Sequence, residues 1–156
     1  MPIEVPELNR NCPFCNYIGD PSRFATVEDL PDTVAFLPPR QSGRGHVLVI
    51  PKRHAPTLLD LEHTEALAIM RHVHRIAHAL SKAFDPAGLN VFQNNGVLAG
   101  QTVPHYHVHI VPSYPGDPPG RIFRAEETER MEREELQKIA DEIAAHLEPL
   151  PSGVLS

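Results

Sequence analysis

Three histidines at alternate positions are the residues of this chain whose types and spacing are best suited to chemistry. His105, His107 and His109 lie in a run rich in β-branched and aromatic residues, a composition typical of a strand. Successive side chains of a strand point to opposite faces, so the three imidazoles are expected to share one face at intervals of roughly 7 Å. Imidazole can act as a nucleophile, a proton carrier or a metal ligand. The spacing therefore indicates a functional site rather than a row of surface histidines.

The loop before this strand carries groups suited to binding phosphate. Gly100 lets the backbone approach a ligand closely, while exposed N–H groups, the Gln101 amide and the Thr102 hydroxyl are donors for phosphate oxygens. A neutral imidazole can attack phosphorus when its far nitrogen is held by a hydrogen bond, and a second, protonated ring can stabilise the developing negative charge. This combination predicts phosphoryl or nucleotidyl transfer without an obligatory metal.

The two cysteines, Cys12 and Cys15, are spaced C-x-x-C. In a reducing compartment such a pair suits a metal half-site or a redox pair better than a structural disulfide, and no thioredoxin-like βαβ pattern surrounds it. Two further zinc ligands would have to come from elsewhere, and the histidines are the obvious source. The alternative is that both thiols are unpaired and buried, since free cysteine often behaves as a small apolar residue.

Length and charge narrow the class of protein. The chain has 156 residues, 41% of them hydrophobic, and a net charge of -6, which predicts one globular domain over residues 1–156. No apolar stretch approaches the roughly 18 residues that span a bilayer, and the chain start lacks a signal pattern, so we expect a cytoplasmic location and no membrane partner. The acidic balance argues against nonspecific nucleic-acid binding but is compatible with a small phosphorylated ligand.

The elements that must position the histidines are short strands and a long helix. Besides the triad segment, strands are expected over residues 23–27, 33–36, 46–51 and 89–93. Residues 57–60 have the form of a helix start, and apolar residues at three- and four-residue steps predict an amphipathic helix over about 64–84. These apolar residues are Leu67, Met70, Val73, Ala77, Leu80 and Phe84. A short loop joins the last two strands, which favours an antiparallel sheet and the α+β class.

The long helix also carries His72, His74 and His78. His74 and His78 have the i, i+4 spacing that can hold a metal, but no acidic partner shares it, so a solvated face is the favoured interpretation. A second helix is expected over about 125–148, with its charged face solvated, followed by a loosely ordered tail over 149–156.

The triad segment resembles a known family signature. His105-Tyr-His-Val-His-Ile-Val111 is similar to the histidine triad (HIT) pattern His-φ-His-φ-His-φ-φ, where φ is apolar. Residues 45–54 and 92–103 are similar to the family's upstream strand and phosphate loop, so the resemblance covers a core of about 12–115. It implies an α+β fold of about five antiparallel strands, one main helix and a C-terminal helix. It also implies a homodimer that binds a purine nucleotide at the end of the sheet.

The resemblance also implies roles for individual residues. In the family the middle histidine, here His107, attacks the α-phosphate to give a covalent nucleotidyl-histidine intermediate that water resolves, with no cofactor. By position, His109 would contact the phosphate and assist the leaving group, His105 would orient His107, and His46 would complete the cluster. The matching phosphate-binding positions are Asn94, Gly100, Gln101 and Thr102, and the matching base-pocket positions are Phe14, Phe36 and Leu48.

A zinc site is implied by the same resemblance. Some bacterial members bind zinc through an N-terminal C-x-x-C, the histidine of a Pro-Lys-Arg-His segment and the first triad histidine. The matching residues here are Cys12, Cys15, His54 and His105. They form a closed Cys2His2 set, which is the composition expected for structural zinc.

Two positions depart from the family pattern. Pro38 stands where an Asp or Asn usually holds the ribose hydroxyls, and Pro has no such polar side chain. Ser113 stands where many relatives have Arg, which removes a possible charge partner for a longer polyphosphate. Either change could narrow or shift the range of substrates.

The sequence thus favours a nucleotidyl hydrolase acting on a dinucleoside polyphosphate or a nucleoside phosphoramidate. The transferase branch of the family has Gln in place of the third histidine, so His109 favours hydrolysis. Two alternatives stay open. One is a nucleotide-binding or scaffold protein with incidental turnover, and the other is a metalloenzyme whose three triad histidines hold a catalytic zinc.

Overall fold

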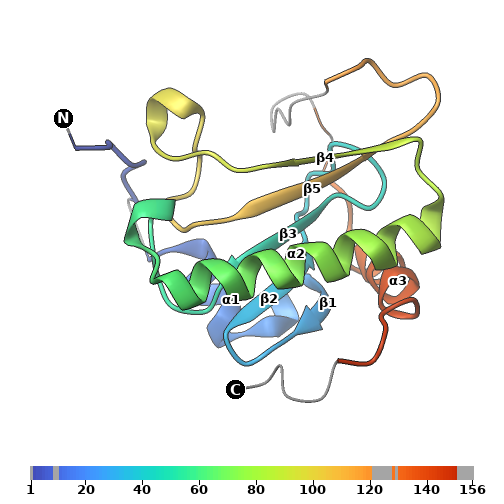
Figure 1. Ribbon diagram of the computed structural model, residues 1–156, viewed down its shortest axis with the longest axis horizontal. Helices are drawn as coiled ribbons and strands as arrows, with labels where there is room; N and C mark the ends of the chain where they lie inside the picture. Colours follow the sequence, from blue (N-terminus) through green and yellow to red (C-terminus); the bar gives the residue numbers. More distant parts are fainter. Residues whose placement is uncertain (1, 9–10, 121–127, 129, 151–156) are drawn as a thin grey trace.

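The computed structural model describes residues 2–8, 11–120, 128 and 130–150. Its centre is one antiparallel sheet with the strand order β1-β2-β3-β5-β4 (Figure 1). The strands are β1 (Ala25–Asp29), β2 (Thr33–Leu37), β3 (Val47–Pro51), β4 (Gly88–Phe92) and β5 (Val108–Ser113). The helices are α1 (Pro13–Gly19), α2 (His63–Phe84) and α3 (Arg133–Ala144), with short 3-10 turns at Pro21–Arg23, Leu58–Asp60 and Val97–Ala99. The predicted α+β fold is confirmed.

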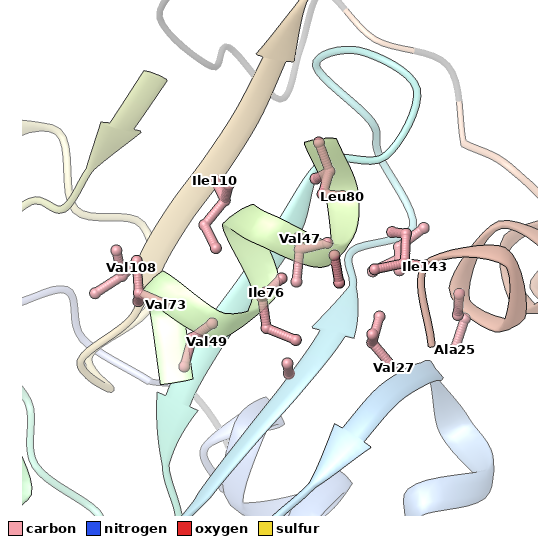
Figure 2. Packing of buried hydrophobic residues seen from close by; sticks show 14 of the residues in the cluster. Ala25, Val27, Val47, Val49, Val73, Ile76, Leu80, Val108, Ile110 and Ile143 are labelled. Atoms are coloured by element: carbon pink, nitrogen blue, oxygen red, sulfur yellow. The ribbon is translucent and has the colours of Figure 1, made fainter. Parts of the chain in front are cut away.

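The two faces of the sheet carry two separate apolar clusters. On one face α2 and α3 pack over alternate residues of the strands, and Figure 2 shows Val49, Val108 and Ile110 of the strands gathered around Val73 and Ile76 of α2. On the other face α1 packs on the residues between them, and its cluster contains Phe14, Tyr17, Val34, Phe36, Leu48 and Ile50. Because side chains alternate along a strand, β2 and β3 contribute to both clusters.

This alternation decides where the triad lies. Tyr106, Val108 and Ile110 belong to the cluster under α2, while His109 pairs with Leu48 across the sheet on the opposite face. The predicted separation of histidines from apolar residues is therefore confirmed. The observed strand begins later than predicted. β5 starts at Val108, so His109 is the one triad histidine that lies within it. The Tyr106 N–H bonds the carbonyl of Ala55, 2.6 Å away, outside any strand.

Helix α2 has the expected length and buries Val73 and Leu80 of the expected stripe, but the rest of its packed face differs. Its buried residues include Ile69 and Ile76, whereas Leu67 and Met70, which we expected on the packed face, are 46% and 52% exposed. The helix carries two overlapping apolar stripes, and the sheet contacts only one of them. The capping box at Thr57 belongs to a separate 3-10 turn, and α2 begins at His63 after a second capping box.

Other boundaries shift for local reasons. β1 begins at Ala25 because Pro21–Arg23 forms a 3-10 turn, and it continues through residues 28 and 29, beyond the expected end at residue 27. The C-terminal helix is Arg133–Ala144, shorter than the expected 125–148. Residues 125–127, 129 and 151–156 of the expected helix and tail lie outside the described residues.

Among the described residues, none of the helices combines the length and the apolar character that crossing a bilayer requires.

Candidate active site

The central triad histidine is held by the backbone of the first one. The ring of His107 is buried, and its Nδ1 lies 2.7 Å from the carbonyl oxygen of His105. A carbonyl can only accept, so Nδ1 carries the proton and the neutral ring has its lone pair on Nε2. The sequence interpretation gave His105 the task of orienting His107, and the backbone of His105, rather than its ring, makes this contact.

A chain of hydrogen bonds leads from a loop to the third triad histidine. The backbone N–H of Ser42 donates to Nδ1 of His46 at 3.3 Å, so the neutral ring of His46 carries its proton on Nε2. His46 Nε2 lies 3.0 Å from Nδ1 of His109 and donates to it. His109 accordingly carries its own proton on Nε2. The cluster thus contains one ring with a lone pair on Nε2, His107, and one with an N–H there, His109.

Aromatic contacts hold both rings in place. The edge of Phe14 meets His107 with ring centroids 5.4 Å apart and an interplanar angle of 80°. Phe92, the last residue of β4, stacks on His109 at 4.5 Å and 4°. The centroids of His107 and His109 are 4.9 Å apart, so one phosphate group can reach both rings.

Burial keeps these imidazoles neutral. Burial, together with the smaller effect of the neighbouring His107, lowers the pKa of His46 to about 3 and that of His109 to about 2. Burial also lowers the pKa of His107, although its hydrogen bond to the His105 carbonyl raises it. At neutral pH the His107 lone pair is therefore available for attack.

Gln101 does not lie as expected. It is 4% exposed, its Oε1 accepts from the N–H of Gly96 at 2.6 Å, and its Nε2 donates to the carbonyls of Pro56 and Val103 at 2.6 and 2.9 Å. Every polar atom of the amide is thus engaged with backbone. In this structure Gln101 stabilises the loop instead of offering a free amide donor, and its contact with a phosphate stays a prediction.

The remaining phosphate-loop residues lie at the surface or close to it. Gly100 has φ of 85°, in the left-handed region that favours glycine, and its carbonyl accepts from Asn94 Nδ2 at 3.3 Å. Thr102 is exposed. Their contact with a phosphate stays a prediction.

The three base-pocket residues lie together in the apolar cluster under α1. Phe36 is completely buried, and Leu48 and Phe14 are 4% and 7% exposed. Phe14 covers Phe36 edge-on, with ring centroids 5.6 Å apart. Phe14 therefore has the most surface to offer a base, and the pocket stays a prediction.

The first triad histidine belongs to a different group of side chains. The donor atoms of Cys12, Cys15, His54 and His105 all lie within 4.8 Å of one another. His105 Nδ1 is 3.5 Å from Cys12 Sγ and 3.6 Å from Cys15 Sγ, and His54 Nδ1 is 3.3 Å from Cys15 Sγ. Ligand atoms around tetrahedral zinc are roughly 3.4–3.8 Å apart, given Zn–S of about 2.3 Å and Zn–N of about 2.0 Å. The four residues therefore fit such an ion.

Two further features suit a metal rather than a redox pair. The far nitrogen of His105, Nε2, lies 2.8 Å from the Pro51 carbonyl and donates to it, which directs the Nδ1 lone pair at the thiols. Burial, followed by the adjacent Cys12, raises the pKa of the Cys15 thiol to about 11. Reactive redox cysteines have a lowered pKa, whereas a bound cation removes thiol protons directly.

The three triad rings do not share one ion site. The Cys2His2 set is the only group of three or more potential ligands among the residues that the structure describes, and it excludes His107 and His109. A catalytic zinc held by all three histidines is therefore not supported.

The histidines of α2 are divided between core and surface. His72, expected on a solvated face, is buried, and its Nδ1 lies 2.8 Å from the hydroxyl of Thr33. Its Nε2 lies 3.3 Å from Glu28, in an orientation that makes no hydrogen bond. His74 and His78 are exposed as expected, with their Nε2 atoms 3.2 Å apart.

Sequence reasoning missed Gln41 and Ser42. They lie in a loop that has no periodicity and no recognisable motif, and only the fold brings them to His46. Pro38, the departure from the family pattern, is buried in this loop and accepts a hydrogen bond from Gln41 at 3.0 Å. Ser113, the other departure, accepts from the Asn90 side chain at 3.1 Å.

Comparison with known proteins identifies the family. The HIT domain family model matches residues 23–116, which hold the whole sheet and the triad. The chain belongs to the HIT family. Protein hit of Bacillus subtilis is 38% identical over 138 residues, covering 88% of this chain and 94% of that protein. The resemblance deduced from the triad segment is thus confirmed.

Two other relatives of this HIT protein have names that describe an activity. Adenylylsulfatase HINT3 of Arabidopsis thaliana is 31% identical over 157 aligned positions, covering 98% of this chain and 78% of that protein. Adenosine 5'-monophosphoramidase hnt1 of Schizosaccharomyces pombe is 34% identical over 102 residues, covering 65% and 74%. Both names refer to a bond made by an adenylyl group.

Solved structures of the family have the same fold. A Hit-like protein of Bartonella henselae matches with a TM-score of 0.78 and 30% identity, over 90% of this chain and all (100%) of that one. A zinc-bound histidine triad family protein of Mycobacterium smegmatis matches with a TM-score of 0.74 and 28% identity, over 87% of this chain and 92% of that one.

Proposed function

We propose that this HIT protein hydrolyses nucleotide conjugates at the α-phosphate through a covalent nucleotidyl-His107 intermediate. The observation that carries the proposal is the 2.7 Å hydrogen bond from His107 Nδ1 to the His105 carbonyl. This bond places the proton on one nitrogen and the nucleophilic lone pair on the other. The names of the adenylyl-cleaving relatives support the same class of substrate.

The reaction takes two displacements at phosphorus. His107 Nε2 forms a bond to the α-phosphorus while the bond to the leaving atom breaks, and the leaving atom departs with that electron pair and takes a proton from solvent. The Nε2–H of His109 donates a hydrogen bond to the negative charge that develops. Water then attacks phosphorus, the P–N bond breaks, its electron pair returns to His107, and the proton lost by the water passes to solvent. The products are a nucleoside monophosphate and the free leaving group.

The proposed substrates are nucleoside phosphoramidates and dinucleoside polyphosphates, with a purine base against Phe14. Both carry a leaving group on the α-phosphorus of a nucleotide, which is the one feature that the two imidazoles need. A nucleotide-binding or scaffold protein with incidental turnover is the alternative. The neutral, pre-oriented His107 favours the enzyme, because binding alone does not require a free lone pair at that position.

Zinc is the proposed resident ion of the Cys2His2 set. Cys12, Cys15, His54 and His105 would hold it, and a closed set of four protein ligands gives the ion a structural task. When bound, it would tie the start of α1 to the segment that precedes β5. The zinc-bound family structure from Mycobacterium smegmatis supports this assignment. The displacement steps use imidazoles only.

A homodimer is the proposed assembly. β4 is an edge strand, and its Leu89 and Val91 are exposed. Leu67 and Met70 of α2 are exposed as well, so apolar surface lies on two elements that a second copy could cover. We expect Val91→Lys to be monomeric by sedimentation, whereas Leu98→Lys, at a fully exposed loop position, should remain dimeric. A monomeric wild-type protein at micromolar concentration would exclude this assembly.

A single domain over 1–156 and a cytoplasmic location stay predictions.

The test of the proposed chemistry uses adenosine 5'-phosphoramidate as substrate. We expect release of AMP and, after rapid quenching, an acid-labile adenylyl group on His107. His107→Asn should show neither, while His74→Asn, at an exposed histidine, should behave as the wild type. Turnover should persist in a chelator as long as the protein stays folded. Undiminished hydrolysis by His107→Asn would refute the nucleophile assignment.

A further inference from the structure

A side chain of the loop before β3 forms hydrogen bonds with the backbone of His46. Gln41 Oε1 accepts from the N–H of His46 at 3.0 Å, and Gln41 Nε2 donates to the carbonyl of the same residue at 2.9 Å. The same Nε2 donates to the Pro38 carbonyl at 3.0 Å. One side-chain amide therefore bridges both backbone groups of His46 and closes the loop 38–46 on itself.

The loop has further fixed points around this amide. The carbonyl of Pro39 accepts from the N–H of Met131 at 2.8 Å, which ties the loop to the segment before α3. At its other end Gly45 has φ of 87°, and a Cβ there would lie 2.9 Å from the Phe84 ring, so only glycine fits. The Ser42 N–H is consequently presented to Nδ1 of His46 by a loop of defined shape.

The position of this N–H decides where two protons lie. If His46 carried its proton on Nδ1, that proton would face the Ser42 N–H, and His46 Nε2 would face His109 as an acceptor. His109 would then place its proton on Nδ1 and turn a lone pair, instead of an N–H, toward the substrate. The 3.3 Å contact of the Ser42 N–H therefore sets the tautomer of His46, and the 3.0 Å contact of His46 in turn sets the tautomer of His109.

We propose that Gln41 is a positioning residue that, through the Ser42 N–H and His46, keeps the proton of His109 on Nε2, where it can hydrogen-bond the leaving atom. This inference rests on the proposed function and deepens it. The amide of Gln41 bonds the loop backbone at Pro38 and His46, not the rings of His107 and His109. Its effect should therefore be specific to the leaving group and absent from the attack by His107.

The type of side chain matters, because the amide both donates and accepts. In Gln41→Glu, a carboxylate of the same shape would face the carbonyl oxygens of Pro38 and His46 in place of the amide donor. Gln41→Leu removes all three hydrogen bonds at similar volume. Gln137→Leu is the matched control, since Gln137 also bridges two segments, from α3 to Thr26 of β1, away from the imidazoles.

The kinetic test compares two aryl esters of AMP. A 4-nitrophenolate leaving group spreads its negative charge over the ring, whereas 4-methoxyphenolate concentrates it on oxygen and depends more on a donor. We expect Gln41→Leu to lower kcat/KM for the 4-methoxyphenyl ester by about 10²-fold, the usual effect of losing one such donor. The 4-nitrophenyl ester should lose several-fold less, and Gln137→Leu should leave the ratio unchanged. Equal losses on both esters would overturn the proposal.

A second measurement reads the protons directly. In ¹⁵N spectra of the imidazoles, wild-type His46 and His109 should both show a protonated Nε2, and Gln41→Leu should show a mixture of tautomers at His109. The isosteric Gln41→Glu should show the same mixture, which keeps the test available if Gln41→Leu does not fold. Unchanged tautomers in both variants would overturn the proposal. The adenylyl-His107 trapped in the wild type is a separate result, so failure of the proposed function would be recognised independently.

Discussion

His105 on one side, and His107 with His109 on the other, have different surroundings although only Tyr106 separates His105 from His107 in the chain. The ring of His105 faces the exposed His54 and the thiols of Cys12 and Cys15, which lie at the start of α1. The rings of His107 and His109 face other imidazoles and aromatic edges, with backbone groups setting their tautomers. The first group offers four lone pairs that converge on one point, and the second offers one lone pair beside one N–H.

The difference shows that burial alone does not determine what an imidazole does. Burial lowers the pKa of His105 to about 4, and it lowers the pKa of His107 as well, so both rings are neutral at pH 7. The partner of the second ring nitrogen decides the outcome. Both rings donate to a backbone carbonyl, but the remaining lone pair faces thiols at His105, whereas at His107 it stays available for a substrate beside the ring of His109.

The largest expected effect separates the two adjacent histidines by activity. His107→Asn should lower kcat by about 10⁴-fold or more, because the nucleophile is lost. His105→Asn keeps the backbone carbonyl that orients His107, so it should lower kcat by no more than about 10²-fold, the range seen when groups around a site are disturbed. Steady-state hydrolysis of adenosine 5'-phosphoramidate measures both. A loss in His105→Asn as large as in His107→Asn would remove the distinction between the groups.

The next effect separates the groups by metal content. Zinc at 1,000 times its Kd should stabilise the wild type by about 4 kcal/mol in urea unfolding, and Cys12→Ser should lose this gain together with the bound zinc. His107→Asn should retain both, since its ring lies outside the Cys2His2 set. Elemental analysis alongside the unfolding curves provides the measurement. Loss of zinc from His107→Asn would show that the two groups share one ion.

A smaller effect concerns pH and the imidazole cluster. The folded-state pKa of His46 is about 3, far below the unfolded value of about 6.5, so between these values only the unfolded chain takes up a proton. Stability from this group is complete above about pH 6.5 and is lost as pH falls, by about 2 kcal/mol at pH 5. Urea unfolding of His46→Asn at pH 7 and pH 5, at fixed zinc, should show a correspondingly smaller decrease than the wild type. Parallel curves would contradict a neutral buried His46.

The smallest effect extends the comparison to α2. His72 is buried against Thr33, so His72→Ala should lower the free energy of unfolding by about 1–2 kcal/mol through the loss of packing and a buried hydrogen bond. His74→Ala, on the exposed side of the same helix, should change it by less than about 0.5 kcal/mol. Thermal and urea unfolding measure both, and neither variant should alter kcat. Equal stability of the two variants would mean that the contact with Thr33 contributes nothing.

The parts of the molecule that depend on local periodicity could be predicted from the sequence. Alternation placed the triad histidines opposite Tyr106, Val108 and Ile110, and helical spacing located α2 to within one residue at its start. The spacing of Cys12 and Cys15 indicated half of a metal set. These features follow from the backbone geometry of strands and helices, which repeats along the chain.

Only the tertiary fold fixes which of several possible partners a side chain contacts. It turned Ile69 and Ile76 of α2 inward instead of Leu67 and Met70, and it engaged the Gln101 amide with backbone. It also brought Gln41 and Ser42 of an irregular loop onto His46. The buried stripe of α2 and the contact of Gln101 with Pro56 depend on segments distant in sequence, which offer several equivalent partners until the sheet and its helices pack together. Gln41 and Ser42 lie only five and four residues from His46, but no local periodicity fixes the shape of their loop.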